Sequence, residues 1–455
     1  MANDRRRPNV VVMITHDTGR FLSPYGYRTV DTPAFERLAA HSATFDGCFC
    51  TTPLCAPSRA ALLTGTYPHQ NGMMGLPGEH LGGWDLVAKD RHLAAVFSAN
   101  GYAAVLCGFE HETHDFFSVG FQRGIHGIGT ANNGGRPLAG ADEDVEAWLD
   151  DRYGDQVPGR DGAEPFYLQI GCSDTHRDWT RYSEPDDSKG VWKAPYLIDD
   201  PAVDVEMAQQ QGACRTLDRG VGAILDLFER RGLADDTIFV ITTDHGIDFP
   251  RAKGTLFDPG IECFLFMRYR AGGWTEGVRV GDLVSHVDVY PTILETSGID
   301  VPNGTVGRSF LPLLTGKGDY RPRDAVYLEK TYHDNYDPMR GLRTKRYKYV
   351  LNFDAQTLYD VRIATAPRYN WFRFPYAKRN REELYDLEQD PNEATNLADD
   401  ADHQETARRL KTQLAEWMQA TDDPLLDGPI PSPYHLRASA EMKRLAEQAQ
   451  RPEDE

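Results

Sequence analysis

Residues 55–65 read CAPSRAALLTG, and the other informative residues of the chain are best placed relative to this stretch. The TTP at 51–53 before it is typical of a loop, whereas Pro57 and Ser58 suit the first turn of a helix. The alanines and leucines that follow are strong helix formers. We therefore predict a helix that begins near Cys55, where unpaired N–H groups and the helix dipole favour a bound anion.

A small buried residue is the ordinary interpretation of Cys55, because free cysteine is among the most buried residue types. It does not explain why Pro57, Ser58 and Arg59 follow at fixed spacing, nor the LTG at 63–65. This pattern resembles the signature of type I sulfatases, which are formylglycine-dependent members of the alkaline-phosphatase superfamily. The resemblance implies that a formylglycine-generating enzyme oxidises Cys55 to formylglycine, whose hydrated aldehyde supplies the nucleophile.

Two predicted strands end in residues that suit a metal site. Residues 9–14 and 237–243 are apolar runs typical of buried parallel strands, and they are followed by THD at 15–17 and DHG at 244–246. Open α/β sheets bind ligands at the carboxyl ends of such strands. The resemblance implies one divalent cation there, Ca²⁺ by family. The residues that it places around the cation are His16, Asp17, Cys55, Asp244 and His245.

His16 departs from the family pattern, which has two adjacent aspartates at positions 16 and 17. Its imidazole either ligates the cation through nitrogen or only hydrogen-bonds to the site. Because Ca²⁺ prefers oxygen ligands, one or two imidazoles would favour Mn²⁺ or Zn²⁺ instead. For Asp17, a turn or helix-cap role is the ordinary alternative.

A second departure follows the predicted strand at 103–107. The GFEH at 108–111 stands where the family carries Gly-Lys-x-His. His111 matches the histidine that assists breakdown of the sulfated intermediate, although membership of a surface cluster with its acidic neighbours is the alternative. Phe109 replaces the lysine that bridges nucleophile and sulfate, which weakens the expected anion pocket.

Two further residues match the family pattern. His176 follows the predicted strand at 164–170 and matches a histidine near the leaving-group oxygen, with Asp174 as its expected orienting partner. Lys253 matches a lysine that contacts the sulfate; a solvated surface lysine is the alternative. With Arg59 it would add positive charge where the transferred group develops negative charge. The catalytic residues that the resemblance implies are Cys55, Arg59, His111, His176 and Lys253.

The overall composition limits the partners. The net charge is -20 and the pI about 5.1, which argues against a nucleic-acid partner, so a small anionic sulfated substrate must be held by local positive charge. The 7 cysteines show neither a disulfide framework nor a zinc pattern. No apolar run reaches membrane-spanning length, and the run at 10–14 is too short for the core of a signal peptide. We expect no membrane partner and a cytoplasmic location.

The expected fold is α/β, with an alkaline-phosphatase-like, mostly parallel central sheet flanked by helices. We predict a catalytic domain at 1–324 and a smaller α+β subdomain at 325–455, with a small antiparallel sheet and a helix. Residues 32–43 are expected to be helical. The Gly- and Asp-rich residues 127–161 are expected to form a surface excursion. Residues 332–340 resemble a substrate-side loop of the heparan N-sulfatase (sulfamidase) branch.

Together these features predict a sulfatase that hydrolyses a sulfate ester or sulfamate, on a sugar by resemblance to that branch. Two alternatives remain at this point. One is a formylglycine-dependent phosphonate monoesterase or phosphodiesterase, which the loss of a lysine at Phe109 favours. The other is a non-catalytic anion-binding protein with unmodified Cys55, which would not require Pro57 and Arg59.

Overall fold

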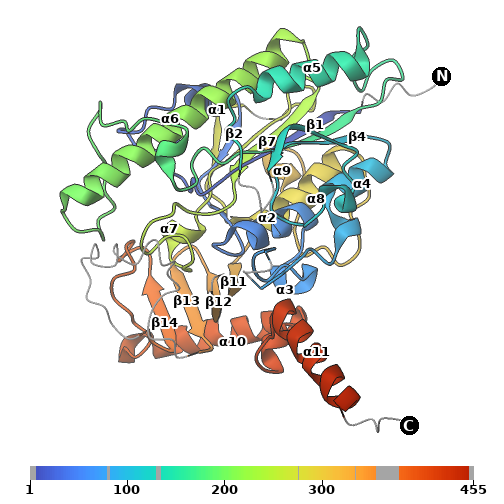
Figure 1. Ribbon diagram of the computed structural model, residues 1–455. Helices are drawn as coiled ribbons and strands as arrows, with labels where there is room; N and C mark the ends of the chain where they lie inside the picture. Colours follow the sequence, from blue (N-terminus) through green and yellow to red (C-terminus); the bar gives the residue numbers. More distant parts are fainter. Residues whose placement is uncertain are drawn as a thin grey trace, which may run out of the picture.

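The computed structural model describes residues 7–78, 82–129, 135–274, 276–333, 335–354 and 379–449. Within these ranges the larger part of the chain is built on an eight-stranded sheet with the order β5-β4-β6-β1-β7-β8-β2-β9 (Figure 1). Its strands are β1 (Asn9–Thr15), β2 (Ala43–Phe45), β4 (Ala103–Phe109), β5 (Arg123–Gly129), β6 (Phe166–Gly171), β7 (Thr237–Thr243), β8 (Leu265–Arg268) and β9 (Val278–Val280).

The centre of this sheet is parallel. β1 pairs in parallel with both β6 and β7, and β4 pairs in parallel with β5 and β6, whereas β8 runs antiparallel to β7. Every residue of β1 and β7 is buried, as expected for apolar strands covered on both faces. The predicted mostly parallel α/β sheet is therefore confirmed.

Helices cover both faces of the sheet. Alternate residues of β1 enter two different cores: Val10 and Val12 pack with α2 and α8, whereas Val11 and Met13 pack with α1, α5 and α6. Figure 1 shows these two helical layers on opposite sides of the strands. The helices of this part are α1 (Pro33–Ala40), α2 (Cys55–Thr64), α3 (Pro68–Asn71), α4 (Leu93–Ala99), α5 (Ala141–Tyr153), α6 (Pro201–Arg230), α7 (Asp258–Ile261), α8 (His286–Thr296) and α9 (Leu311–Thr315).

Shorter elements complete the described structure. A two-stranded parallel pair joins β3 (Cys48–Phe49) to β10 (Val284–Ser285). The 3₁₀ turns of the larger part are η1 (Ser23–Tyr25), η3 (Lys89–Arg91), η4 (Phe116–Val119) and η5 (Trp179–Arg181), and those of the C-terminal part are η7 (Ala401–His403) and η8 (Pro424–Leu426).

Two expectations about this part need correction. The helix predicted at 32–43 is confirmed as α1, but it ends at Ala40, because Ala43 already pairs with Met267 of β8. The predicted surface excursion at 127–161 contains α5, whose Val145 and Trp148 are buried against the sheet. The abundant Gly and Asp concealed this short amphipathic helix. Residues 130–134 of that stretch lie outside the described residues.

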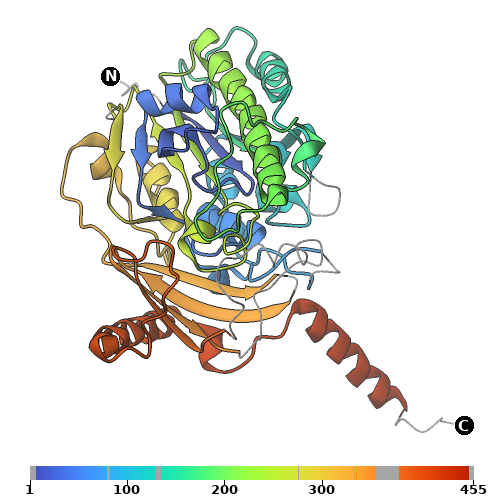
Figure 2. The same ribbon diagram turned by 90° about the vertical axis from the view of Figure 1, so that its left-hand side faces the viewer.

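The C-terminal part is a smaller antiparallel sheet with the order β11-β12-β13-β14. α10 lies along this sheet, and α11 projects away from the rest of the molecule (Figure 2). The bounds are β11 (Val326–Tyr332), β12 (Tyr336–Arg343), β13 (Tyr347–Asn352), β14 (Glu382–Asp386), α10 (Gln404–Ala420) and α11 (Pro433–Ala449). The predicted small sheet with a helix is confirmed, whereas the exact domain boundary after residue 324 stays a prediction.

The expected substrate-side loop at 332–340 is also wrong, because most of it is strand β12 in the interior of this sheet. Its Arg340 is fully buried and pairs with Asp423, so its guanidinium is committed to the protein interior. Residue 334 lies outside the described residues.

β11 reaches the loops that carry the signature. The Glu329 backbone N–H donates to the carbonyl of Thr51 at 2.8 Å. The buried Lys330 Nζ donates to the carbonyl of Gly254 at 2.9 Å, and the Gly254 N–H donates to the carbonyl of Pro53 at 3.0 Å. The C-terminal sheet therefore fixes both the residues before Cys55 and the segment after β7.

No helix in the described ranges is long and apolar enough to cross a membrane.

Candidate active site

Two aspartates meet where β1 and β7 end. Thr15 pairs with Thr243 in register, so the residues that follow each strand are neighbours. Asp17 adopts a left-handed backbone with φ of 54°, a conformation that Asp tolerates better than most residues. Its backbone N–H donates to Asp244 Oδ1 at 2.9 Å, and this oxygen also accepts the His245 N–H at 2.8 Å. The two strand ends are thereby locked together.

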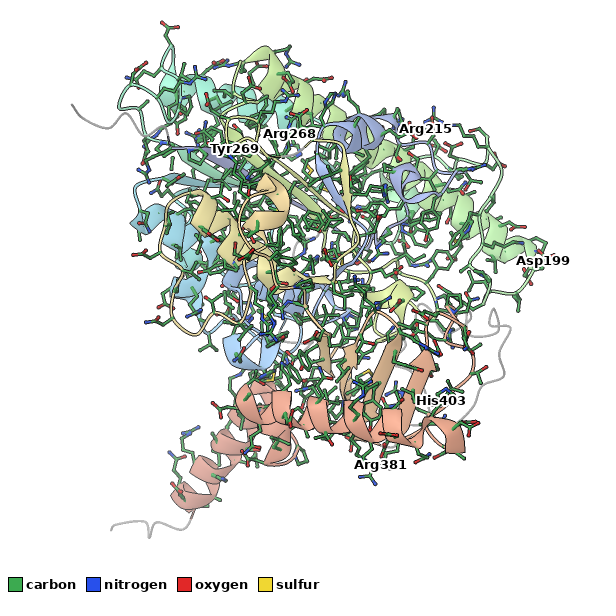
Figure 3. The ribbon with its side chains drawn as sticks, turned by 180° about the vertical axis from the view of Figure 1, so that it is seen from behind. Asp199, Arg215, Arg268, Tyr269, Arg381 and His403 are labelled. Carbon is green, nitrogen blue, oxygen red and sulfur yellow. The ribbon has the colours of Figure 1, made fainter. Side chains whose placement is uncertain are left out.

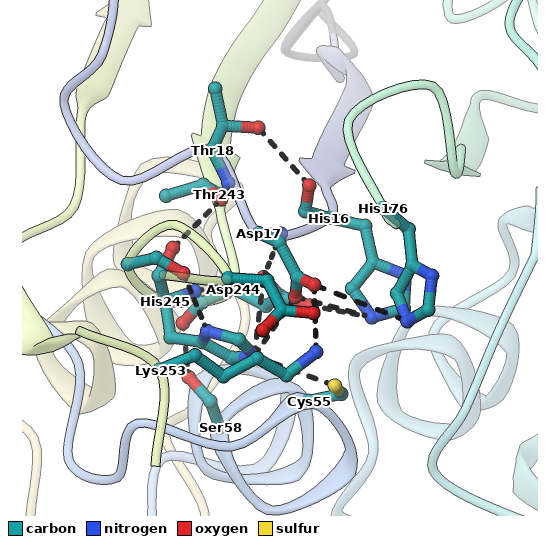
Figure 4. A network of polar contacts seen from close by, with 12 residues as sticks. His16, Asp17, Thr18, Cys55, Ser58, His176, Thr243, Asp244, His245 and Lys253 are labelled. Atoms are coloured by element: carbon teal, nitrogen blue, oxygen red, sulfur yellow. Dashed lines mark hydrogen bonds and ion pairs between the residues drawn. The ribbon is translucent and has the colours of Figure 1, made fainter. Parts of the chain in front are cut away.

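Two histidines complete the cluster (Figure 4). His16 Nε2 lies 3.6 Å from Asp17 Oδ1 and 3.5 Å from Asp244 Oδ2. His245 Nε2 lies 3.2 Å from Asp17 Oδ1 and 3.4 Å from Cys55 Sγ. The structure thus brings together all five residues that the sequence suggested for a metal site.

The donor atoms of this cluster fit a divalent cation. Ligand atoms of His16, Asp17, Cys55 and Asp244 all lie within 4.8 Å of one another. Both ring nitrogens of His16 and Oδ1 of Asp17 are buried and form no hydrogen bond with the described residues. Buried polar atoms without partners are costly. A cation coordinated by these atoms would remove that cost.

The electrostatics of the cluster favour a bound positive charge. Burial would lower the pKa of His245, but the carboxylates of Asp244 and Asp17 raise it to about 9. Burial would raise the pKa of Asp17, but the positive charge of Lys253 holds that pKa well below its usual range. The shift of His245 shows that the two buried carboxylates favour a positive charge beside them.

Signature residues on α2 hold this cluster in place. Cys55 is the first residue of α2 and is buried. One turn later, Ser58 Oγ donates to the Asp244 carbonyl at 2.5 Å and Arg59 Nε donates to Asp244 Oδ2 at 3.1 Å. Arg59 Nη2 also donates to the Thr15 carbonyl at 3.1 Å. Ser58 and Arg59 therefore lie one helical turn after Cys55, and their side chains contact residues at the ends of both β1 and β7.

A cavity of about 190 Å³ opens next to the cluster. Phe109 stacks on His16 with ring centroids 5.2 Å apart, and the Arg59 guanidinium lies 5.2 Å from the Phe109 ring. An aromatic ring thus occupies the place expected for a lysine and covers Arg59. The lining residues that matter most are His16, Phe109, His111, His176, Arg181 and Tyr182.

His111 and His176 both line this cavity. The ring nitrogens of His111 and His16 and the sulfur of Cys55 form a second group of potential ligand atoms within 4.8 Å of one another. The His176 ring centroid lies 4.4 Å from that of His16. Burial lowers the pKa of His176 to about 3. The imidazole is therefore neutral at pH 7.

Asp174 does not orient His176 as the sequence suggested. Its Oδ2 accepts the Leu138 N–H at 2.9 Å, whereas His176 Nδ1–H donates to the carbonyl of Arg177. The two side chains are therefore held by different partners. Lys253, by contrast, lies where it was expected: its Nζ is 2.7 Å from Asp17 Oδ2.

The sulfatase family model matches residues 8–299, which is well over half of the chain. The chain belongs to the sulfatase family. This membership makes it a sulfuric ester hydrolase. A second model, for the C-terminal part of N-sulphoglucosamine sulphohydrolase, matches residues 249–364.

One relative in sequence and two solved structures are similar to this chain. The chain is 28% identical to human N-sulphoglucosamine sulphohydrolase, covering 93% of each protein. Its fold is similar to that of a protein solved with D-glucosamine-2-N,6-O-disulfate as its substrate, with a TM-score of 0.71, 17% identity, and 93% and 99% of the two chains covered. It is also similar to the phosphonate monoester hydrolase of Agrobacterium radiobacter, with a TM-score of 0.67, 19% identity, and 91% and 96% covered.

Sequence reasoning missed two threonines that support this sulfatase site. Thr175 Oγ1 donates to the His16 carbonyl at 2.5 Å, and its hydroxyl lies 2.9 Å from that of Thr18. The Thr18 N–H donates to Thr243 Oγ1 at 3.1 Å. These bonds join the ends of β6, β1 and β7. Threonine is common beside strands, so no local pattern distinguished these residues.

Proposed function

We propose that this chain releases sulfate from a sulfated sugar, with a formylglycine made from Cys55 as nucleophile and one divalent cation as cofactor. The observation that carries the proposal is the convergence of Asp17, Asp244 and His245 on the Cys55 sulfur at the edge of the sheet. A sugar N-sulfate or O-sulfate is the proposed substrate class, supported by the similarity to N-sulphoglucosamine sulphohydrolase over nearly the whole chain.

The cation would be held by Asp17, Asp244 and His245, with His16 as a further nitrogen donor. When present, the cation supplies positive charge to the sulfate oxygens and the formylglycine supplies the attacking oxygen. Ca²⁺ is the family expectation, whereas the two imidazoles favour Mn²⁺ or Zn²⁺.

The chain's own residues would prepare the substrate. Lys253, at the edge of the cluster, would bind an oxygen of the sulfate group. Arg59 holds Asp244 in place rather than facing the cavity. His111 and His176 line the cavity, where they would hold or move a proton at the Cys55 position and at the leaving atom.

A phosphonate monoester is the second candidate substrate. The specific observation in its favour is Phe109, which stands where the sulfatase pattern has a second lysine. Of the two expected lysines, the described structure therefore has Lys253 alone beside the cluster. The fold similarity to a phosphonate monoester hydrolase is compatible with this alternative.

The test is a substrate panel: 4-nitrophenyl sulfate, glucosamine N-sulfate, glucosamine 6-O-sulfate, a phosphonate monoester and a phosphodiester. The protein is made with a formylglycine-generating enzyme and reloaded with Ca²⁺, Mn²⁺ or Zn²⁺. We expect the highest kcat/KM for a sulfated sugar and none in Cys55→Ser, which cannot form the aldehyde. Faster turnover of the phosphonate, or full activity of Cys55→Ser, would overturn the proposal.

A further inference from the structure

A second cavity, of about 530 Å³, adjoins the active-site cavity, because Arg181 and Tyr182 line both. The active-site cavity alone, at about 190 Å³, is smaller than the roughly 300–1,000 Å³ typical of small-molecule sites. The adjoining cavity falls inside that range. Arg181 therefore borders both cavities, so a ligand that extends from the first cavity toward the second meets its side chain.

The second cavity is locally positive in a chain of net charge -20. Arg215 and Arg219 lie one turn apart on α6 and both line it together with Arg181. The acidic residues among its lining are Glu184 and Asp186. Three arginines and two acidic residues thus line this cavity.

One of those arginines is neutralised and two are not. Arg215 Nη1 lies 3.1 Å from Asp186 Oδ2. Arg219 donates to the Thr216 hydroxyl at 2.9 Å, and Arg181 lies over the Tyr182 ring at 5.1 Å. Neither Arg181 nor Arg219 forms an ion pair with any residue that the structure describes, so both guanidinium groups retain capacity for an anion.

The wall of this cavity is held rigidly. A Cβ on Gly212 of α6 would lie 1.9 Å from the Glu184 carbonyl, so the loop packs directly on the helix backbone. The Asp186 N–H donates to the Ala208 carbonyl at 2.8 Å, and Tyr182 Oη donates to the Gly135 carbonyl at 3.0 Å. Because the loop is already ordered, little entropy is lost when a ligand binds.

We propose that this cavity binds a second anionic group of an oligosaccharide substrate, carried by the sugar next to the one that loses its sulfate. The inference rests on the proposed function and deepens it, because it assigns an oligosaccharide rather than a free monosaccharide. Arg181 and Arg219 would bind a carboxylate or sulfate through paired N–H donors, which suit planar and tetrahedral oxyanions.

The test compares two disaccharides that carry the same sulfate on the first sugar. In one, the second sugar is a uronic acid; in the other, its carboxyl is reduced to a hydroxymethyl group. Dissociation constants are measured by calorimetry at low salt on the full chain with unconverted Cys55, so that no turnover occurs. We expect the uronate to bind about tenfold more tightly in the wild type, as for one charged hydrogen-bonded contact.

The ratio should fall to about one in Arg181→Gln with Arg219→Gln, and salt should reduce it in the wild type because the arginines are exposed. Arg381→Gln is the matched control: this exposed arginine lines another cavity on the C-terminal part, far from Arg215 (Figure 3). It should keep the wild-type ratio.

Equal affinity of the wild type for both disaccharides would overturn the inference, as would a ratio that the double variant keeps. Sulfate release from the uronate disaccharide by the converted protein is measured in parallel. Its absence would count against the proposed function, whereas equal dissociation constants alongside active enzyme would count against the second anion site only.

Discussion

Lys253 Nζ lies 2.7 Å from Asp17 Oδ2, so a lysine that follows β7 is paired with a carboxylate that follows β1. The Lys253 N–H donates to the Ile247 carbonyl at 3.0 Å, which fixes the backbone that carries it. Because Phe109 occupies the place of the family's other lysine, Lys253 is the lysine that we expect to contact the substrate sulfate.

Lys253→Met should lower kcat/KM for 4-nitrophenyl sulfate by about 100-fold, the scale of losing one positioned donor to developing charge. Lys253→Arg keeps the charge and should recover part of the loss. Thermal unfolding of both variants should stay near that of the wild type. A Lys253→Met enzyme within threefold of wild-type activity would show that the lysine does not contact the sulfate.

Asp17→Asn and Asp244→Asn should both remove bound metal, measured by elemental analysis, because each takes a charged ligand from the shared cluster. Their stabilities should differ. Asp244 is the carboxylate beside fully buried Arg59, so its loss should cost about 3–5 kcal/mol in metal-free protein. Asp17 can keep its left-handed backbone as Asn, and flexible Lys253 can move toward solvent. Equal urea midpoints for the two variants would contradict this contrast.

His16→Asp should move metal preference toward Ca²⁺ and away from Mn²⁺ or Zn²⁺, because it replaces a nitrogen donor by oxygen. The measurement is metal content after the chelated protein is exposed to an equimolar mixture of the three ions. Phe109→Leu, which removes the ring stacked on His16 without changing a donor, is the control. Unchanged selectivity in His16→Asp would exclude His16 as a ligand.

A pH effect on stability is expected from a buried histidine that does not line the active-site cavity. Buried His92 caps α4 by accepting the Ala94 N–H at Nδ1, and burial lowers its pKa from 6.5 to about 4. Between these two pH values His92 is protonated in the unfolded chain but not in the folded chain. The free energy of unfolding therefore falls as pH drops from 6.5 toward 4. The full contribution, present above pH 6.5, is about 3 kcal/mol.

His92→Asn keeps a capping side chain but removes the titrating group. Urea unfolding at pH 7 and pH 4.5 should therefore show a smaller loss on acidification than in the wild type. The same loss in both proteins would assign the acid sensitivity to other groups.

Local sequence patterns were sufficient for the elements that carry the site. Apolar runs located β1 and β7, and the helix formers after Cys55 located α2, because these signals depend on neighbours in the chain. The convergence of both strand ends followed from the parallel sheet. What no local pattern could give was the side-chain partner of each residue, as the separate fates of Asp174 and His176 show.

The same limit applies to contacts between the two sheets. His69, on α3, places Nδ1 at 2.6 Å from Glu329 Oε2 on β11. Arg340 resembled a substrate-side residue in sequence, yet it is buried on β12 beside the same carboxylate at 3.5 Å. Residues 69, 329 and 340 are brought together only by tertiary folding, which a single sequence does not reveal.

Cys55 is 1% exposed at the start of α2, and β11 closes over the residues that precede it. A maturation enzyme needs its target thiol within reach, so under the proposed function the oxidation must precede completion of the fold. The fraction of active protein would then depend on the rate of modification relative to the rate of folding. We expect slower synthesis or lower temperature to raise the converted fraction, and protein that folds unconverted to remain inactive when the enzyme is supplied later.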